Sequence, residues 1–257
     1  MKNICLYFLT AGMLLLTGCL ENTQEITLNK DGSGTISTIS DMSTLLGLAK
    51  NMGAGAEMDK LAGQKMDTVI SLTNLVDSIE NLTDNEKQVL KKGTMGVTMD
   101  ISQEKFSTKL SFPFSALSEI TSITKLTGKV SAQSMKEQMA NMPGSDQGMN
   151  LGMNNMPEPS SFDDYFDMKF TDDKIERSIN KEKYAKASAD EYLNGIKQAS
   201  AMGIPVTSTL ILNLPRPAEK VEGTNVKLSD DKMKVTVKAD INDFFDHPEK
   251  LEFKVKF

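Results

Sequence analysis

Runs in which apolar and polar residues alternate recur along this chain and predict β-strands. In the clearest case, an alternating run from Met95 to Ile101 is followed, after residues 102–104, by another from Phe106 to Phe114. This spacing predicts an antiparallel hairpin. The other predicted strands lie at Gln24–Asn29, from Thr35, at Phe166–Phe170, Ile175–Ile179, Leu210–Leu214, Met233–Val237 and Leu251–Phe257.

Turn and cap residues separate these runs. Asp31-Gly32-Ser33-Gly34 is a hairpin-turn sequence, and it lacks the Lys-Ser/Thr pair of a phosphate-binding loop. Thr83-Asp84-Asn85-Glu86 is a capping-box signature that predicts the start of a helix ending near Gly93. Further helices are predicted from Ser43, from about Ser115 and from Ser188.

Strand pairs with helices between them predict an α+β fold, with a mostly antiparallel sheet and helices packed on one face. The composition changes over 131–161, where methionines lie among Gly, Asn, Pro and Ser. We expect this part to be a flexible, Met-rich insertion or linker. It would divide the body into an N-terminal α+β half, 25–130, and a C-terminal α+β half, 162–257.

The N-terminus carries a short apolar segment, from Ile4 to Leu16, that follows Lys2. It is shorter than the ~20 residues of a membrane-spanning helix and has the layout of a secretory signal peptide. Leu16-Thr17-Gly18-Cys19 at its end resembles the lipobox of bacterial lipoproteins. The other interpretation is an ordinary secretory signal followed by a chance cysteine.

The lipobox resemblance implies that residues 1–18 are removed and that Cys19 carries a diacylglyceride and an N-acyl chain such as palmitate. Leu16, Thr17 and Gly18 would then be recognised by the signal peptidase, and 19–24 would form a lipidated tether. Leu20 follows the cysteine where an Asp would retain some lipoproteins at the inner membrane. The resemblance therefore favours the outer membrane of the cell envelope, periplasm-facing or surface-exposed.

Charge and cysteine content narrow the class of partner. The full chain has 29 Lys and Arg against 35 Asp and Glu, a formal net charge of −6. An acidic balance disfavours nucleic acid as a partner, because phosphates attract basic surfaces. Cys19 would be the only cysteine left after cleavage, so an intramolecular disulfide is excluded.

Several short segments carry a family resemblance: Glu25–Thr35, Thr83–Gly93, Ser111–Phe114 and Leu228–Asp231. With the lipobox they resemble uncharacterised envelope lipoproteins common in Bacteroidota. The first hairpin is also weakly similar to the mycobacterial LppM-type lipoprotein domain. The resemblance implies a lipid-anchored α+β module and transfers no catalytic residue.

The residues that could support catalysis are few. His247 is the only histidine, and we expect it in an exposed loop. Asp240-x-Asn242 resembles the start of a calcium loop, but Phe245 and Leu251 replace the required Gly and Glu. The acidic groups around Asp163 and Asp240 are therefore interpreted as solvated turns. We predict no catalytic site and no enzyme.

Methionines form the one unusual pattern. Two sets share a 4-then-3 spacing: Met135, Met139 and Met142, then Met149, Met153 and Met156. Thioethers are ligands for Cu(I), so the alternative function is a periplasmic Cu(I)-sequestering lipoprotein. Methionine also fills core space, and the spacing is that of an amphipathic helix, so packing or linker is preferred.

From these observations we expect a lipid-anchored envelope lipoprotein that acts as a non-enzymatic binding or structural module. It would contact the membrane through its anchor and bind an envelope protein or a lipid. We expect no cofactor and no metal beyond the Cu(I) alternative.

Overall fold

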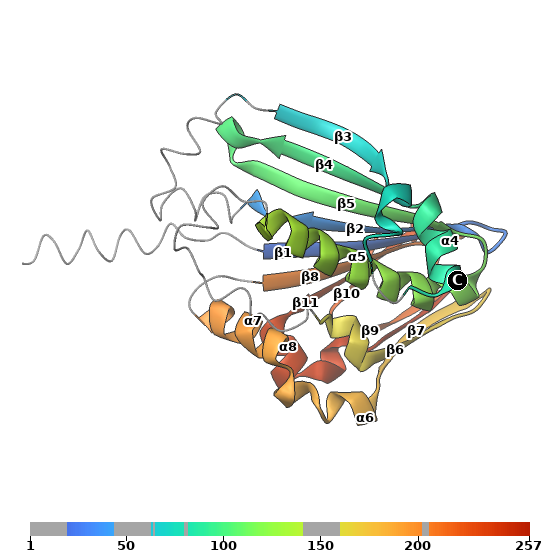
Figure 1. The fold of residues 1–257 in the computed structure, drawn as a ribbon. Coiled ribbons are helices and arrows are strands. Elements are labelled where there is room, and N and C mark those ends of the chain that lie inside the picture. Colours follow the sequence, from blue (N-terminus) through green and yellow to red (C-terminus); the bar gives the residue numbers. More distant parts are fainter. Residues whose placement is uncertain (1–19, 44–62, 64, 80–81, 141–159, 202–205) are drawn as a thin grey trace, which may run out of the picture.

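A computed structural model describes residues 20–43, 63, 65–79, 82–140, 160–201 and 206–257. Within these residues the chain has the predicted α+β fold, with a large sheet, a small sheet and helices (Figure 1). No helix in the described part is long and apolar enough to cross a membrane.

The large sheet has eight strands. In spatial order they are β10 (Val226–Leu228), β11 (Lys234–Asp240), β8 (Val206–Asn213), β1 (Leu20–Leu28), β2 (Gly34–Asp41), β5 (Lys105–Phe114), β4 (Thr94–Asp100) and β3 (Lys65–Ser71). Neighbours are antiparallel except β1 and β8, which run parallel. This one parallel pair joins residues from opposite ends of the chain.

The small sheet has four antiparallel strands: β6 (Phe166–Phe170), β7 (Lys174–Ile179), β12 (Phe253–Lys256) and β9 (Lys220–Gly223). The chain crosses from the small to the large sheet between β9 and β10, at Gly223, whose φ is +142°. A Cβ at this glycine would lie 2.5 Å from Val226 Cγ2.

Helices and 3-10 turns connect the strands. The α-helices are α4 (Asp84–Lys92), α5 (Ile120–Ala140), α6 (Lys181–Tyr184), α7 (Glu191–Ala201) and α8 (Ile241–Asp246). The 3-10 turns are η2 (Leu72–Leu75), η3 (Ile101–Gln103), η4 (Leu117–Glu119), η6 (Phe162–Tyr165), η7 (Ala187–Ala189) and η8 (Pro248–Leu251). Both α4 and α5 pack against β5, and α5 also lies along β2.

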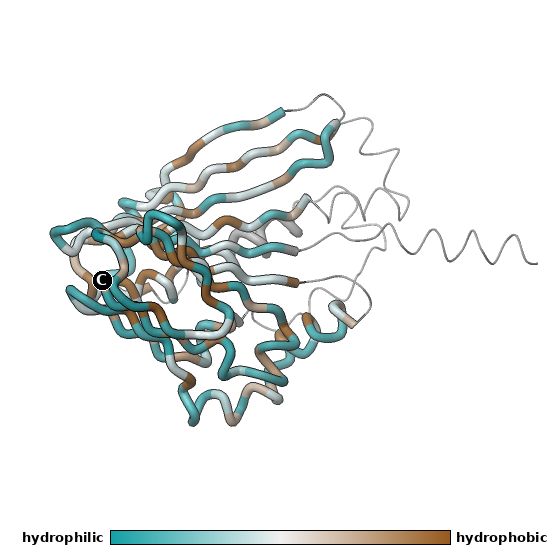
Figure 2. Tube along the Cα trace, turned by 180° about the vertical axis from the view of Figure 1, so that it is seen from behind, coloured by the Kyte–Doolittle hydropathy of each residue, from teal (hydrophilic) through white to brown (hydrophobic). Residues whose placement is uncertain are grey.

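One hydrophobic cluster joins both sheets and α5. Ile26 and Phe112 enter it from the large sheet, Ile123 from α5 and Val255 from the small sheet, each at most 1% exposed. Apolar and polar positions alternate along the strands, as Figure 2 shows. Side chains therefore fill the space between the sheets.

A second cluster surrounds Phe244 of α8. The Phe162 ring stacks on it at 5.1 Å between centroids, and the rings of Tyr165 and Tyr184 meet it edge-on. The Tyr184 hydroxyl also donates to the Phe244 carbonyl at 2.8 Å. These contacts hold α6, α8 and η6 together beside the small sheet.

The strongest sequence signals are confirmed. Strands β4 and β5 form the predicted hairpin, and Gly32 has a φ of +80° in the turn between β1 and β2. At α4, Thr83 and Glu86 form both bonds of the capping box. Local hydrogen bonding determines these features, so the sequence alone could predict them.

Three boundaries differ from the predictions. Residues 20–24 were expected in a tether, but β1 begins at Leu20. Residues 131–140 were expected in the flexible segment, but they continue α5, and 141–159 lie outside the described residues. Helix α7, predicted to start at Ser188, is capped instead by Asp190, which accepts from the Leu193 N–H at 2.9 Å, whereas Ser188 lies in η7.

Candidate functional site

The lipobox, Leu16 to Cys19, lies outside the described residues, so the site nearest to it begins at Leu20. Leu20 is the first residue of β1 and pairs with Val206 of β8. The next residue, Glu21, pairs with Asp41 of β2. The residue that follows Cys19 is therefore already held inside the large sheet.

Seven strands of the large sheet have one terminus at the same end of the sheet as Leu20. We call this end the Leu20 rim; its terminal strand residues are Leu20, Asp41, Lys65, Asp100, Lys105, Val206 and Asp240. The antiparallel order of the strands places these residues together. Ser43, the last residue before the undescribed 44–62, lies at the same end, because its hydroxyl accepts from the Phe106 N–H of β5 at 3.0 Å.

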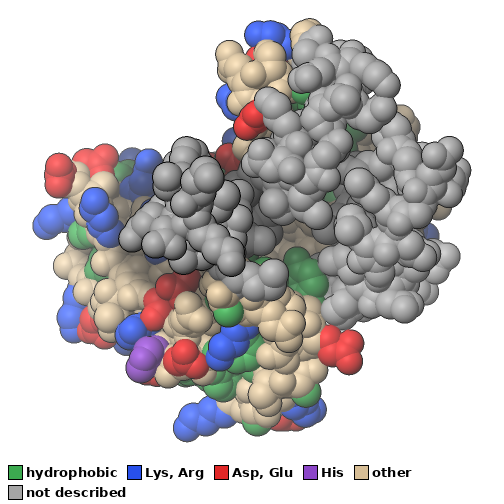
Figure 3. All heavy atoms as spheres, turned by 90° about the vertical axis from the view of Figure 1, so that its left-hand side faces the viewer, with side chains coloured by type: hydrophobic (Ala, Val, Ile, Leu, Met, Phe, Trp, Pro, Cys, Tyr) green, Lys and Arg blue, Asp and Glu red, His purple; other side chains and the backbone are tan. Residues whose placement is uncertain are grey.

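Charges of both signs lie on the rim. We count the last two residues of each of the seven strands at the rim. They include four carboxylates and two ammonium groups: Glu21, Asp41, Asp100 and Asp240 against Lys65 and Lys105. Figure 3 views this end of the molecule and shows acidic and basic side chains mixed around the grey, undescribed residues. The rim strands thus carry a small excess of negative charge.

At one side of the rim, an ion pair links β3 to β4. Lys65 Nζ lies 2.9 Å from Asp100 Oδ2, and Asp100 Oδ1 accepts from the Ser102 hydroxyl at 2.6 Å. The hydrogen bond from Ser102, followed by that from Lys65, lowers the pKa of Asp100 to about 2. Asp100 also caps η3 by accepting from the Gln103 N–H at 3.2 Å.

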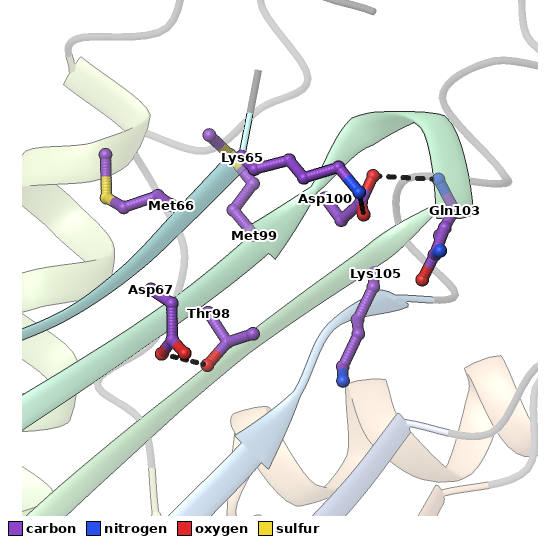
Figure 4. Close-up of a pocket in the computed structure, with 8 residues that line it drawn as sticks. All are labelled: Lys65, Met66, Asp67, Thr98, Met99, Asp100, Gln103 and Lys105. Atoms are coloured by element: carbon purple, nitrogen blue, oxygen red, sulfur yellow. Dashed lines mark hydrogen bonds and ion pairs between the residues drawn. The ribbon is translucent and has the colours of Figure 1, made fainter. Parts of the chain in front are cut away.

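A hollow of about 210 Å³ surrounds this pair (Figure 4). Its lining is completed by Met66, Asp67, Thr98, Met99, Gln103 and Lys105. The Thr98 hydroxyl donates to Asp67 at 3.4 Å, and Lys105 points away from the ion pair. The hollow is smaller than the pockets of about 300–1,000 Å³ that usually hold small molecules.

The chemistry of the hollow is that of a polar contact surface. General acid–base catalysis needs a pKa near the working pH. The Asp100 carboxylate, with its pKa lowered to about 2 and its oxygens bonded to Lys65 and Ser102, does not meet that need. Its bonds instead hold the ends of β3 and β4 in place.

Strand β3 is an open edge of the large sheet. All seven of its residues are exposed, and Val69 is 70% exposed. Beyond β4 it pairs with no other strand among the described residues. An exposed strand edge offers unpaired backbone groups to another strand.

The other candidate side chains have structural partners. His247 is exposed, as expected, with Nδ1 3.6 Å from Glu249 Oε1. Asp240 caps α8 by accepting from Asn242 and Asp243 N–H groups at 2.8 Å. Asp163 faces the Arg177 guanidinium at 3.1 Å. Among the described residues, no group of three His, Cys, Asp or Glu could hold a metal ion.

The methionines of the Cu(I) alternative are only partly described. The backbone of Met135 and Met139 belongs to α5. Met142, Met149, Met153 and Met156 lie outside the described residues, so the Cu(I) alternative stays a prediction.

Sequence reasoning missed the rim and the β3 edge. Strand β3 reads Lys-Met-Asp-Thr-Val-Ile-Ser and lacks apolar alternation with a buried face. The Lys65 charge opposite Asp100 becomes visible only once the register of β3 and β4 is known. Comparison of the chain with protein families, curated proteins and solved structures finds no match.

Proposed function

We propose that this chain is a lipid-anchored envelope lipoprotein that serves as a non-enzymatic binding or structural module. The observation that carries the proposal is the lipobox immediately before β1. Acylation of Cys19 would attach the membrane anchor to a strand near the middle of the large sheet. Two or three acyl chains hold a protein stably at a membrane.

Two features of the body support a binding or structural role. The core cluster is continuous through both sheets and α5, which suits a rigid scaffold. The β3 edge offers a place for a partner strand, because β-augmentation uses an exposed sheet edge. The carboxylates of Asp100, Asp163 and Asp240 are engaged in ion pairs or caps, which supports a module without an active site.

Metabolic labelling with a clickable palmitate analogue tests the anchor. We expect the wild-type chain to be labelled and to partition into the detergent phase. Cys19→Ala should abolish both, whereas Cys5→Ala should keep both, because Cys5 lies in the part that is removed. Label that persists in Cys19→Ala would refute the proposal.

A further inference from the structure

No residue separates the proposed lipid anchor, Cys19, from the first strand of the large sheet. The sequence places Cys19 next to Leu20, and Leu20 is already paired with Val206. Consecutive Cα atoms lie about 3.8 Å apart, so an acylated Cys19 holds the rim within one residue of the lipid headgroups. A lipoprotein with a long tether could swing freely, whereas this one could not.

The rim is wide enough to rest on a surface. It includes the ends of seven strands, and neighbouring strands lie about 4.8 Å apart, which gives a width of about 30 Å. The anchor directly precedes β1, the third strand counted from β11, and therefore lies inside this width. The turn after Leu28 lies about 30 Å away, since β1 has nine residues and rises about 3.4 Å per residue.

The charges of the rim select the kind of surface. Asp100 is ion-paired with Lys65 and Asp240 caps α8, which leaves Glu21 and Asp41 against Lys105. Anionic lipid would repel this excess of negative charge. A zwitterionic layer of phosphoethanolamine headgroups offers ammonium groups to Glu21 and Asp41 and phosphates to Lys105.

We infer that the Leu20 rim docks on zwitterionic phospholipid headgroups, with the large sheet standing on the membrane and the β1–β2 turn farthest from it. This inference rests on the proposed acylation of Cys19. The docked rim leaves the β3 edge accessible from the side, along the height of the sheet.

Depth-dependent fluorescence quenching tests the orientation in the full, acylated chain. The mature chain loses Cys5 with the signal, and acylation blocks the thiol of Cys19. An introduced cysteine is therefore the one free thiol, so Gln103→Cys and Lys30→Cys can each carry one nitrobenzoxadiazole label. Gln103 lies at the rim and Lys30 in the far turn. In phosphatidylethanolamine–phosphatidylcholine vesicles with headgroup spin labels, we expect at least threefold more quenching at position 103.

A spacer variant is the matched control. Twenty Gly and Ser residues inserted between Cys19 and Leu20 have a mean reach of about 25 Å and should abolish the difference between the two positions. In vesicles rich in phosphatidylglycerol at low salt, quenching at position 103 should fall and should recover with added salt.

The outcomes separate the two proposals. Mass spectrometry of the N-terminal peptide reports acylation independently of orientation. Acylated chains with equal quenching at positions 103 and 30 would overturn the docked rim and leave the anchor intact. Equal quenching at position 103 in both lipid mixtures would overturn the headgroup preference. An unacylated Cys19 would overturn both.

Discussion

Gly34 shows how closely one residue can be constrained. A Cβ there would lie 1.9 Å from the Thr27 carbonyl oxygen and 2.4 Å from the Phe114 ring. Such distances force the backbone of β1 or the ring to move. The absence of a side chain at Gly34 is thus a condition for pairing β1, β2 and β5 at this end.

We expect Gly34→Ala to destabilise the fold by about 2 kcal/mol or more, since overpacking costs about 1–3 kcal/mol. Urea unfolding followed by circular dichroism measures this. Gly128→Ala is the control: apart from the neighbouring backbone of α5 itself, no atom lies within 4 Å of its Cβ position. That change should stabilise by about 0.5–1 kcal/mol. Equal effects of the two changes would refute the steric argument.

Glu86 links α4 to α5 and makes stability depend on pH. Its carboxylate lies 2.7 Å from Lys129 Nζ and accepts from the Thr83 N–H at 2.8 Å. The bond from Lys129, then that from Thr83, lowers its pKa from 4.5 to about 2. The ionised form therefore stabilises the fold above pH 4.5, and this contribution is lost as the pH falls towards 2.

Glu86→Gln should lower stability at pH 6 by about 1 kcal/mol, because it weakens a cap and removes an ion pair. Its stability should then fall less steeply than that of the wild type between pH 5 and 2. Urea midpoints measured across this range test the expectation, with exposed Glu182→Gln as the control. Parallel curves for wild type and Glu86→Gln would contradict it.

At the scale of elements, the small sheet contains a buried charged side chain, Arg177, whose burial opposes folding. This β7 side chain is 4% exposed, and its guanidinium lies 4.1 Å from the Phe166 ring centre. Burial lowers the pKa of Arg177, and the Asp163 carboxylate acts against that shift. Its Nε has no hydrogen-bond partner within the described structure.

Removing the negative charge of Asp163 should therefore reduce stability more than replacing the buried Arg177 by an apolar side chain. We expect Asp163→Asn to destabilise by about 2 kcal/mol, because it leaves a buried guanidinium unpaired. Arg177→Met should change stability by less than about 1 kcal/mol, since an apolar chain suits the site. Thermal unfolding of both variants compares them, and the reverse order would refute this account.

The open β3 edge predicts association at high concentration. Val69→Lys places a charge on the outward face of β3 and should slow loss of soluble protein several-fold. Thr121→Lys, an equal charge change at an exposed position of α5, is the control. Light scattering over time measures the rate, and equal rates for the two variants would contradict edge pairing.

Local chemistry explains how much the sequence could predict. The Thr83 cap and the turn at Gly32 depend on neighbours within a few residues, and both were predicted. The pairing of β1 with β8 depends on residues more than 180 positions apart and leaves no local pattern. The tether prediction was wrong for residues 20–24, because alternation is weak in Glu21–Thr23, where pairing partners hold the strand.

At the scale of the whole molecule, the two predicted halves are not independent. Strands β1 and β8 lie side by side in one sheet, and the core cluster contains residues from 25–130 and 162–257. Both halves should therefore unfold together.

Tyrosine fluorescence offers a direct measurement. Apart from Tyr7, the tyrosines are Tyr165, Tyr184 and Tyr192, all in the C-terminal half. We expect their unfolding midpoint in urea to coincide with that from circular dichroism. Leu212→Ala in β8 should lower the free energy of unfolding by about 2–5 kcal/mol and shift both midpoints equally. Separate midpoints would show two folding units.

The parallel pairing of β1 with β8 also determines the order in which the strands of the large sheet can pair. A chain that emerges N-terminus first can join β1 to β2 within about 20 residues, but the other side of β1 must wait until β8 has emerged. Closing a contact over such a sequence distance is slow. The first strand thus stays half-paired until the last fifth of the polypeptide begins to emerge, and that part also completes the sheet.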